Sequence, residues 1–316
     1  MIGRYNVRRL DFKKIVLYPI KERRNKVSIK DFTDLNVWKK VGRIEDLFPA
    51  ILKGNDIRGI VEAVLKARER ERPVVFAIGA HVIKCGLSPL VIDLMEKGVV
   101  SAIAMNGAGA IHDYEIALIG ETSEDVTLGI NEGIFGMAEE TGAMMNSALK
   151  GFLNDEIGLG EAWGRDISEK AFDFRDNSIL SKGFKLSIPV TIHVAFGTDI
   201  THIHPSSDGA LIGKGTQNDF KLFTSVIVDL NDGGCFFNIG SSVILPEVFL
   251  KALSAVRNLG YKVKDFTTVN MDMIQHYRPV INVIDRPTQE GGRGYSLIGH
   301  HEIMIPLLYD MIVRRL

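Results

Sequence analysis

The stretch Val74-Val-Phe-Ala-Ile-Gly-Ala-His81 decides the class of fold. Continuous apolar residues from Val74 to Ile78 follow Pro73 and predict a strand that is buried on both faces, as in a parallel sheet. Gly79 then predicts a tight turn at the end of this strand. Upstream, Asn55-Asp56 can cap a helix whose apolar residues recur at helical spacing from Ile57 to Leu65.

The same order of strand, glycine turn and helix returns further along the chain. Ser88-Pro89 predicts the start of a helix that stops at Gly98, and Val99 to Met105 predicts a second strand that ends at Asn106-Gly107-Ala108-Gly109-Ala110. Further strands are predicted over residues 186–196, 235–239 and 266–271, and helices over 134–152, 220–230, from Pro246 onward and over 301–313. The alternation predicts an α/β fold with a doubly wound, mostly parallel, Rossmann-like sheet.

The rest of the chain adds less to the predicted fold. Residues 1–316 are interpreted as a single α/β domain, with an N-terminal extension over residues 1–50 that the pattern does not assign. The polar stretch from Asp166 to Lys185 is expected to be a surface excursion.

Composition excludes several classes of protein. The chain has 316 residues and a formal net charge of −1, whereas an electrostatic nucleic-acid binder would need a basic excess. Two cysteines, Cys85 and Cys235, do not make a disulfide framework. No run reaches the roughly 18 apolar residues of a membrane span, and the N-terminus has no apolar signal region. We therefore expect a cytoplasmic protein that acts on a small-molecule ligand, with neither nucleic acid nor membrane as a partner.

The glycine turns at the strand ends are candidate ligand sites. Gly79-Ala80-His81 and Asn106 to Ala110 would let the backbone approach a phosphate, although neither is a strict G-x-G-x-x-G motif. His112-Asp113 follows the second turn directly. This pair either faces the ligand, or Asp113 is simply an acid favoured by the dipole at the start of a helix.

The segment His193-Val-Ala-Phe-Gly-Thr-Asp199-Ile-Thr-His202-Ile-His204-Pro205 is the most unusual in the chain. Pro205 favours extended geometry at His204, and in an extended chain His202 and His204 point the same way. With Asp199 nearby they could hold a divalent metal, or they could be polar loop histidines that make hydrogen bonds. Their grouping at a strand end also favours an active-site role, for which histidine is suited to proton transfer. His300-His301-Glu302 opens the last helix, where neutral, surface or interface roles are expected.

From these turns onward the chain resembles the deoxyhypusine synthase family in the order and spacing of its segments, from about residue 73 to the C-terminus. Gly107-Ala108-Gly109-Ala110-Ile111-His112-Asp113 is similar to the family's Thr-Ala-Gly-Gly-x-Glu-Glu turn, and Phe237 to Ser242 resembles its Gly-Gly-Gly turn. The resemblance implies a Rossmann-like fold, NAD as cofactor and a homotetramer, or at least a homo-oligomer. It also implies a lysine in the run that follows the family's Gly-Gly-Gly turn. Val243-Ile244-Leu245-Pro246 has none, so the family's catalytic lysine is expected to be missing and its transferase reaction with it.

Together these observations predict a deoxyhypusine-synthase-like enzyme that binds a nucleotide such as NAD and catalyses a different reaction. Two alternatives are a metal-dependent hydrolase built on His202 and His204, and a non-catalytic nucleotide-binding module. His112 or His202 would be the acid or base, oriented by Asp113 or Asp199. The predicted catalytic residues are His112, Asp113, Asp199, His202 and His204, and the predicted cofactor contacts are Gly79, Ala80, His81, Asn106, Gly107, Ala108, Gly109, Gly240, Ser241 and Asp272.

Overall fold

The computed structural model describes residues 39, 40, 42–151 and 156–316. Most of the predicted N-terminal extension, and Phe152 at the end of one predicted helix, lie outside the described residues. Six strands form one sheet in the order β3-β2-β1-β4-β5-β6, and every neighbouring pair is parallel. The strands are β1 Val74–Ile78, β2 Ala102–Asn106, β3 Val190–His193, β4 Cys235–Ile239, β5 Thr267–Asp272 and β6 Arg293–Ile298. The doubly wound α/β prediction is confirmed.

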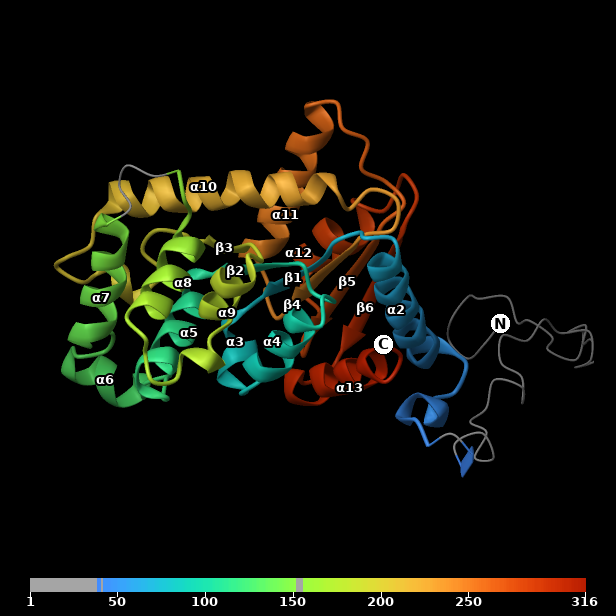
Figure 1. The fold of residues 1–316 in the computed structure, drawn as a ribbon, viewed down its shortest axis with the longest axis horizontal. Coiled ribbons are helices and arrows are strands. Elements are labelled where there is room, and N and C mark those ends of the chain that lie inside the picture. The colour runs from blue at the N-terminus through green and yellow to red at the C-terminus, as the bar shows by residue number, and fades with distance from the viewer. Residues whose placement is uncertain (1–38, 41, 152–155) are drawn as a thin grey trace, which may run out of the picture.

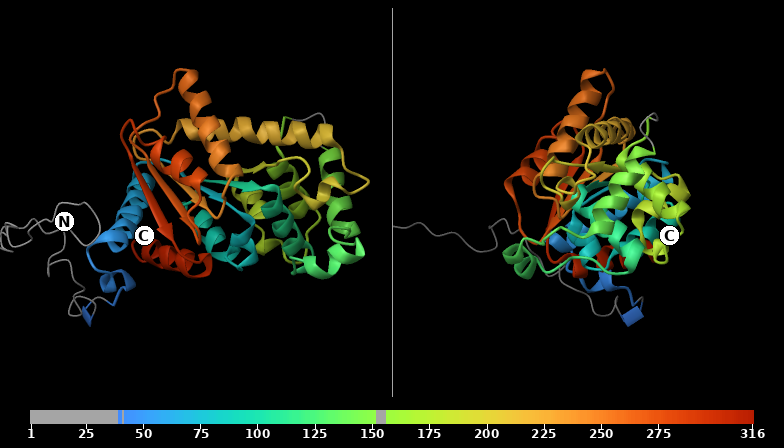
Figure 2. Two further views of the ribbon diagram at one scale, coloured as in Figure 1. Left: turned by 180° about the vertical axis from the view of Figure 1, so that it is seen from behind. Right: turned by 90° about the vertical axis from the view of Figure 1, so that its left-hand side faces the viewer.

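Helices cover both faces of this sheet (Figure 1 and Figure 2). The helices are α2 Leu52–Glu69, α3 Ala80–Lys84, α4 Ser88–Glu96, α5 Gly107–Ile119, α6 Val126–Glu132, α7 Glu139–Lys150, α8 Leu159–Glu169, α9 Ile179–Leu186, α10 Gly209–Val228, α11 Ile244–Asn258, α12 Tyr277–Pro279 and α13 His301–Val313. Short 3-10 turns lie at η4 Ile44–Leu47, η5 Arg175–Asn177 and η6 Ile200–His202, and a π-helical turn, η7, spans Val280–Asp285.

The two faces of the sheet bury alternate residues of the same strands. Phe76 and Ile78 of β1 pack with α2, α4, α5 and α13, whereas Val75 and Ala77 pack with α10, α11 and η7. All five residues of β1 are buried, as are all five of β4, which is why β1 is a continuous apolar run and β4 is apolar except for Asn238.

Three expectations about these elements need correction. The strand predicted over residues 186–196 is confined to Val190–His193, because α9 continues to Leu186. The expected surface excursion from Asp166 to Lys185 instead contains the end of α8, η5 and most of α9, and Ile179 and Leu180 are buried in the core. β6 was not predicted at all. It is an edge strand in which only Tyr295 and Leu297 are buried, so it lacks the apolar run of the central strands.

No helix among the described residues is long and apolar enough to cross a membrane. The sheet order reverses between β1 and β4, which are neighbours in register from Val74 opposite Cys235 to Ile78 opposite Ile239. In a doubly wound sheet this reversal is the switch point, and ligands bind outside the carboxyl ends of the strands there. The residues that follow β1 and β4 are therefore the first place to look for a site.

Candidate functional site at the carboxyl ends of the strands

The glycine turns after β1 and β4 are in direct contact. Gly79 N–H donates to the Ile239 carbonyl at 2.8 Å, and Gly240 N–H donates to the Met271 carbonyl of β5 at 2.9 Å. A Cβ added to Gly79 would lie 2.3 Å from the Gly240 carbonyl oxygen. Gly240 also has a φ of +71°, a conformation that side chains rarely adopt. Both glycines are therefore required by the backbone at the switch point.

A buried pair of asparagines fixes the turn after β4. Asn238 of β4 lies opposite Asn270 of β5, and its Nδ2 donates to Asn270 Oδ1 at 2.8 Å and to the Ser241 carbonyl at 2.9 Å. Ser241 Oγ in turn accepts from Leu245 N–H at 3.2 Å in the first turn of α11. Asn238 and Asn270 are almost completely inaccessible, so these bonds hold the turn from inside the sheet.

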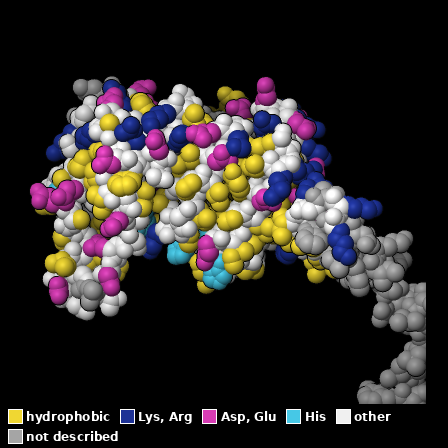
Figure 3. Space-filling view, turned by 60° about the horizontal axis from the view of Figure 1, so that its bottom comes forward, with side chains coloured by type: hydrophobic (Ala, Val, Ile, Leu, Met, Phe, Trp, Pro, Cys, Tyr) yellow, Lys and Arg dark blue, Asp and Glu magenta, His cyan; other side chains and the backbone are white. Residues whose placement is uncertain are grey.

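Two histidines and an aspartate lie near the turn that follows β4. His81 is exposed on α3, His301 is buried at the start of α13, and their ring centroids are 6.3 Å apart. Asp272 ends β5, is buried, and accepts from Met273 N–H at 2.8 Å. We call Gly79, His81, Gly240, Ser241, Asp272 and His301 the switch-point cluster. Seen from below, the molecule shows histidine side chains beside an acidic one, bordered by apolar side chains (Figure 3).

His301 belongs to this cluster although the sequence analysis expected a surface or interface role for its segment. Its side chain is 1% exposed, and a Cβ on Gly240 would lie 2.5 Å from its Nε2. Its Nδ1 is buried and has no hydrogen-bond partner among the described residues. Burial lowers the pKa of His301, against the opposing effect of Asp272, so the ring is neutral near pH 7. The sequence alone does not place His301 in the cluster, because its position depends on the topology that brings the start of α13 to the end of β4.

A second group of polar residues lies at the first turn of α5. Asn106 ends β2 and caps α5, with its Oδ1 accepting from Gly109 N–H at 2.9 Å. Asp199 reaches the same turn from the loop after β3, and a Cβ on Gly107 would lie 1.8 Å from Asp199 Oδ2. Gly107 is therefore needed for the approach of the carboxylate, which the helix dipole favours at this position.

His202 holds Asp199 from the other side. His202 Nδ1 accepts from Gly197 N–H at 3.0 Å, so the neutral ring carries its proton on Nε2, which lies 3.8 Å from Asp199 Oδ2. The ring is stacked on Phe196, with 4.6 Å between centroids. The Asp199 and His202 side chains are 6% and 3% exposed. Burial raises the pKa of Asp199, and the nearby His202 only partly offsets this rise.

The first turn of α5 and the switch-point cluster are contiguous. A Cβ on Gly109 would lie 3.8 Å from the Ala80 Cα, in ordinary contact. Asp199, Gly107, Gly109, Ala80 and Gly79 thus form a continuous line along the carboxyl edge, from the loop after β3 to the turn after β1. The predicted cofactor contacts at Gly79 to His81, Asn106 to Gly109, Gly240, Ser241 and Asp272 all lie on this edge.

Asp113 does not face this edge. Its carboxylate is completely buried and accepts from Ser178 Oγ at 2.6 Å, Ile179 N–H at 2.8 Å and Leu180 N–H at 3.0 Å. These are the first groups of α9, so Asp113 caps that helix across the domain. Burial raises the pKa of Asp113 to about 6, although the three hydrogen bonds lower it. The expectation that Asp113 lines a ligand site does not fit this position.

His112 faces away from the edge as well. Its Nδ1 lies 2.6 Å from Thr122 Oγ1, and Glu115 accepts from the hydroxyls of Thr122 and Thr141. Burial raises the pKa of Glu115, but its hydrogen bonds outweigh this effect and hold the pKa below its ordinary value. Glu115, Thr122 and Thr141 border a hollow of about 600 Å³ between α5 and α7, so His112 belongs to a separate polar network.

The prediction that His202 and His204 point the same way is wrong. η6 is a 3-10 turn rather than extended chain, so the two rings diverge. His204 packs on Gly142 of α7, and its Nδ1 lies 2.7 Å from Ser206 Oγ. Within the described part of the chain, no three His, Cys, Asp or Glu side chains are grouped to hold a metal ion. The metal site predicted on His202 and His204 is therefore not supported.

The remaining histidine of this segment is structural. His193, at the end of β3, is 3% exposed, lies 3.0 Å from Thr191 Oγ1 and packs edge-on against Phe223. Burial lowers its pKa to about 3, so the ring stays neutral.

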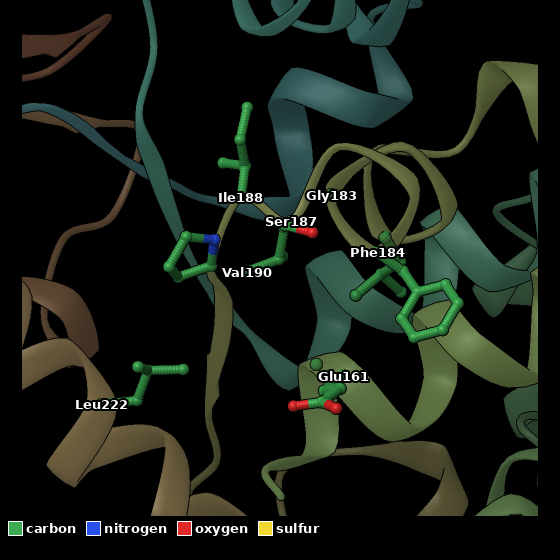
Figure 4. Close-up of a pocket in the computed structure, with 10 residues that line it drawn as sticks. Glu161, Gly183, Phe184, Ser187, Ile188, Val190 and Leu222 are labelled. Atoms are coloured by element: carbon green, nitrogen blue, oxygen red, sulfur yellow. The ribbon is translucent and has the colours of Figure 1, made fainter.

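A further hollow lies at the opposite end of the sheet. It measures about 270 Å³ and surrounds the amino end of β3, where Glu161 of α8, Phe184 of α9 and Leu222 of α10 line it (Figure 4). No predicted site residue lies in it. The chemistry-bearing groups therefore gather at the carboxyl ends of the strands, and this hollow is a feature of the domain's other end.

Comparison with known proteins shows which of them are similar to this chain in sequence or in fold. No protein-family model matches the chain. A curated deoxyhypusine synthase-like protein from Chlorobaculum parvum is 23% identical over 222 residues, which are 63% of this chain and 62% of that protein. The chain thus spans somewhat less than two thirds of the length of this relative.

Solved structures share the fold at lower identity. The structure of a putative deoxyhypusine synthase from Entamoeba histolytica has a TM-score of 0.53 at 12% identity, covering 88% of this chain and 95% of that one. A ternary complex of AgrE with ornithine and NAD+ has a TM-score of 0.52 at 15% identity, covering 82% of this chain but 33% of that one. The resemblance of this chain to the deoxyhypusine synthase family is thus confirmed, by a curated relative in sequence and by a solved structure in fold.

Proposed function

We propose that the chain is a deoxyhypusine-synthase-like enzyme that binds a nucleotide such as NAD at the switch-point cluster and catalyses a reaction without the family's lysine. One observation carries the proposal. The turns after β1 and β4 are in contact at the switch point, and Gly79 and Gly240 leave no room there for side chains of their own. Backbone without side chains at this place is what lets a pyrophosphate approach a doubly wound sheet. The NAD+ in the AgrE complex, which shares the fold, supports the choice of nucleotide.

The residues on this edge fit a dinucleotide. Helix α11 begins directly after the turn at Gly240 to Val243, and its dipole favours an anion there. Leu245 N–H already donates to Ser241 Oγ and Pro246 has no N–H, so Ile244 is the residue of the first turn whose amide would bind a phosphate oxygen. Asp272 is a carboxylate at the end of the next strand, where it would accept hydrogen bonds from ribose hydroxyls. His81 is exposed on the opposite side of the turn. NAD, when bound, supplies a hydride acceptor, and these residues would orient it.

We further propose that Asp199 moves the proton in this reaction and that His202 positions it. His202 Nδ1 accepts from Gly197 N–H, and this bond fixes the ring beside Asp199. Asp199 is buried, and the rise in its pKa brings it closer to the working range of a general acid or base. This reverses the roles expected for a histidine and its orienting aspartate. Gly107 is essential to the arrangement because it leaves room for the carboxylate.

Binding is tested first. Isothermal titration calorimetry of the whole protein with NAD+ and NADH is expected to show saturable binding. Replacing exposed His81 with Glu places a negative charge beside the phosphates and should weaken binding at least about tenfold, since like charges a few ångströms apart repel by more than 1 kcal/mol. Ser147→Glu, which places the same negative charge at an exposed position of α7, is the control and should leave binding unchanged. Absence of binding by both nucleotides would refute the proposal.

Turnover is tested second. The protein is incubated with NAD+ and a panel of amines, amino acids and hydroxy acids, and NADH formation is followed by absorbance. Asp199→Asn should retain NAD+ binding and lose turnover by about 100-fold or more, the usual worth of a general acid or base. Binding without turnover across the panel would instead favour the non-catalytic nucleotide-binding module.

We also propose that the chain assembles into a homo-oligomer, either a dimer or a tetramer. Phe184, Leu186 and Leu222 expose apolar surface around the hollow at the amino end of β3. Light scattering after size exclusion measures the mass directly. Phe184→Glu should lower an oligomeric mass, and a monomer in the wild-type protein would contradict the proposal.

A further inference from the structure

A hollow beside the amino end of β5 lies apart from the switch-point cluster. It measures about 500 Å³, and its lining includes Arg257, Tyr261, Lys262, Lys264 and Glu290. Arg257 belongs to the last turn of α11, Glu290 precedes β6, and the other three lie in the loop that leads into β5. We call this the basic hollow. β5 extends for about 17 Å at about 3.3 Å per residue, so the basic hollow and the switch-point cluster lie at opposite ends of the sheet.

The guanidinium of Arg257 is held in place by backbone carbonyls. Its Nη2 donates to the Val263 carbonyl at 2.8 Å and to the Pro287 carbonyl at 3.3 Å, and its Nε donates to the Val263 carbonyl at 3.3 Å. Nη1 takes no part in these bonds, and none of them goes to a carboxylate. The positive charge of Arg257 is therefore fixed in position and is not neutralised by an acid of the described chain. A guanidinium ordered in advance in this way is suited to bind phosphate oxygens.

Two lysines add to the charge of the basic hollow. Lys262 is exposed and has no polar partner among the described residues. Lys264 Nζ lies 3.7 Å from Asp265 Oδ2, but both side chains are more than half exposed, so water weakens this pair. Glu290 is the acid among the lining residues, and the lining stays positive when Asp265 is counted with it. An anion is therefore the class of ligand that this charge favours.

The size of the basic hollow and its other side chains indicate an anion larger than phosphate. A volume of about 500 Å³ falls within the range of small-molecule sites, roughly 300–1,000 Å³. Tyr261 is 53% exposed, so its ring offers a face on which a planar group can stack. Glu290 would repel a phosphate, but its carboxylate can accept hydrogen bonds from hydroxyl or amino groups elsewhere on the same ligand.

We propose that the basic hollow binds a nucleoside monophosphate. The phosphate contacts Arg257 and Lys262, and the base stacks on Tyr261. This site is separate from the nucleotide site of the proposed function and does not depend on it, because no residue of the switch-point cluster contributes to it. Binding is noncovalent, and no bond of the ligand forms or breaks.

Isothermal titration calorimetry of the whole protein with AMP tests the proposal. AMP should bind saturably, inorganic phosphate should bind more weakly, and adenosine should not bind at the same concentrations. Lys262→Glu should weaken AMP binding at least about tenfold, because it reverses a charge beside the phosphate. Lys150→Glu makes the same change at an exposed position of α7 and is the matched control, which should leave binding unchanged. Thermal unfolding measured by circular dichroism shows whether the variants are folded, and Lys262→Gln replaces Lys262→Glu if that variant is not.

A second variant tests the contact with the base. Tyr261→Leu should weaken AMP binding about fivefold or more, since an aromatic side chain under a base contributes that much or more to affinity. The same variant should leave the weaker binding of inorganic phosphate unchanged. Equal affinity of Tyr261→Leu and the wild type for AMP would refute the proposed position of the base.

The variants at the two ends of the sheet distinguish the two sites. AMP binding that is weakened by Lys262→Glu and not by His81→Glu supports the proposal. The reverse result overturns it, because AMP then binds at the carboxyl edge. Absence of saturable AMP binding, or equal binding of AMP and adenosine, overturns it as well, and Arg257 then only holds the loop before β5. Failure of NAD+ to bind refutes the proposed function but leaves the basic hollow unaffected.

Discussion

Asp113 offers the sharpest test of what this fold requires, because its contacts separate a structural role from a catalytic one. Its buried carboxylate accepts three hydrogen bonds from the first turn of α9. Asp113→Ala leaves three buried donors without an acceptor. Losing one partner from such a charged, buried arrangement costs about 3–5 kcal/mol of unfolding free energy. Asp113→Asn keeps one acceptor oxygen but turns an amide toward donors, and should cost about 2–3 kcal/mol.

Urea denaturation followed by tryptophan fluorescence measures this loss. Trp163 is buried on α8, donates from Nε1 to the Met145 carbonyl at 3.0 Å, and lies on the helix that packs against α9. The same variants should bind NAD+ as the wild type does wherever they are folded, because Asp113 faces away from the carboxyl edge. A variant that loses nucleotide binding or turnover but keeps its unfolding free energy would refute the structural reading of Asp113.

The pH dependence of stability provides a second measure of the same residue. Burial raises the pKa of Asp113 from 3.8 to about 6, so the native state keeps its proton to a higher pH than the unfolded chain. The stabilisation from that proton is complete below pH 4 and is lost as the pH rises through about 6, at about 1.4 kcal/mol per pH unit. The wild-type protein should therefore lose about 3 kcal/mol over this interval relative to Asp113→Asn, and parallel pH profiles of the two proteins would contradict the argument.

Three further outcomes are expected from other contacts. Gly107→Ala should displace the Asp199 carboxylate, because the added Cβ would lie 1.8 Å from its Oδ2. Turnover should fall at least about tenfold while circular dichroism shows an intact fold, and unchanged turnover would count against a catalytic role of Asp199. Asn238→Leu should remove the bonds to Asn270 and Ser241 and cost about 2–3 kcal/mol in chemical denaturation, whereas an unaffected midpoint would show that these bonds do not hold the turn. His193, with its pKa lowered to about 3, should not titrate by NMR across the neutral range, and a midpoint near 6 would contradict its burial.

The central strands could be predicted from the sequence because burial on both faces makes most of their residues apolar, and each strand is followed by a glycine turn or a helix start. β1 and β4 match their predicted bounds, and β2 and β5 begin or end within a few residues of theirs. β6 escaped prediction because an edge strand buries only one row of side chains, here Tyr295 and Leu297. Residues 166–185 were misjudged because Asp166 and Ser178 are polar but paired: Tyr114 donates to Asp166, and Ser178 to Asp113. A polar residue with a partner inside the fold cannot be told from a surface residue by its type.

The candidate site was predictable only where a residue ends a strand or follows it directly. Asn106 and Asp272 end β2 and β5, Gly79 and Gly240 follow β1 and β4, and all four lie on the carboxyl edge. Asp113 was predicted to lie with them because it is close to the glycine turn in the sequence. It lies six residues after the start of α5 at Gly107, and there its side chain contacts the start of α9 rather than the carboxyl edge. His301 was missed because it depends on a strand, β6, that the sequence did not reveal.

The missing lysine and buried His301 both affect the charge that an anion would meet at the turn after Gly240. A lysine after the Gly240 turn would place a fixed positive charge beside the first turn of α11, but this chain has Val243-Ile244-Leu245-Pro246 there. His301 of α13 lies against Gly240, and burial lowers its pKa, so this ring adds no fixed positive charge to the turn. A fixed charge would favour anions at every pH, whereas a buried neutral ring does not. Without a lysine after Gly240, the run that begins α11 carries no fixed positive charge, and an anion at this turn would be bound by backbone amides and by the dipole of the helix.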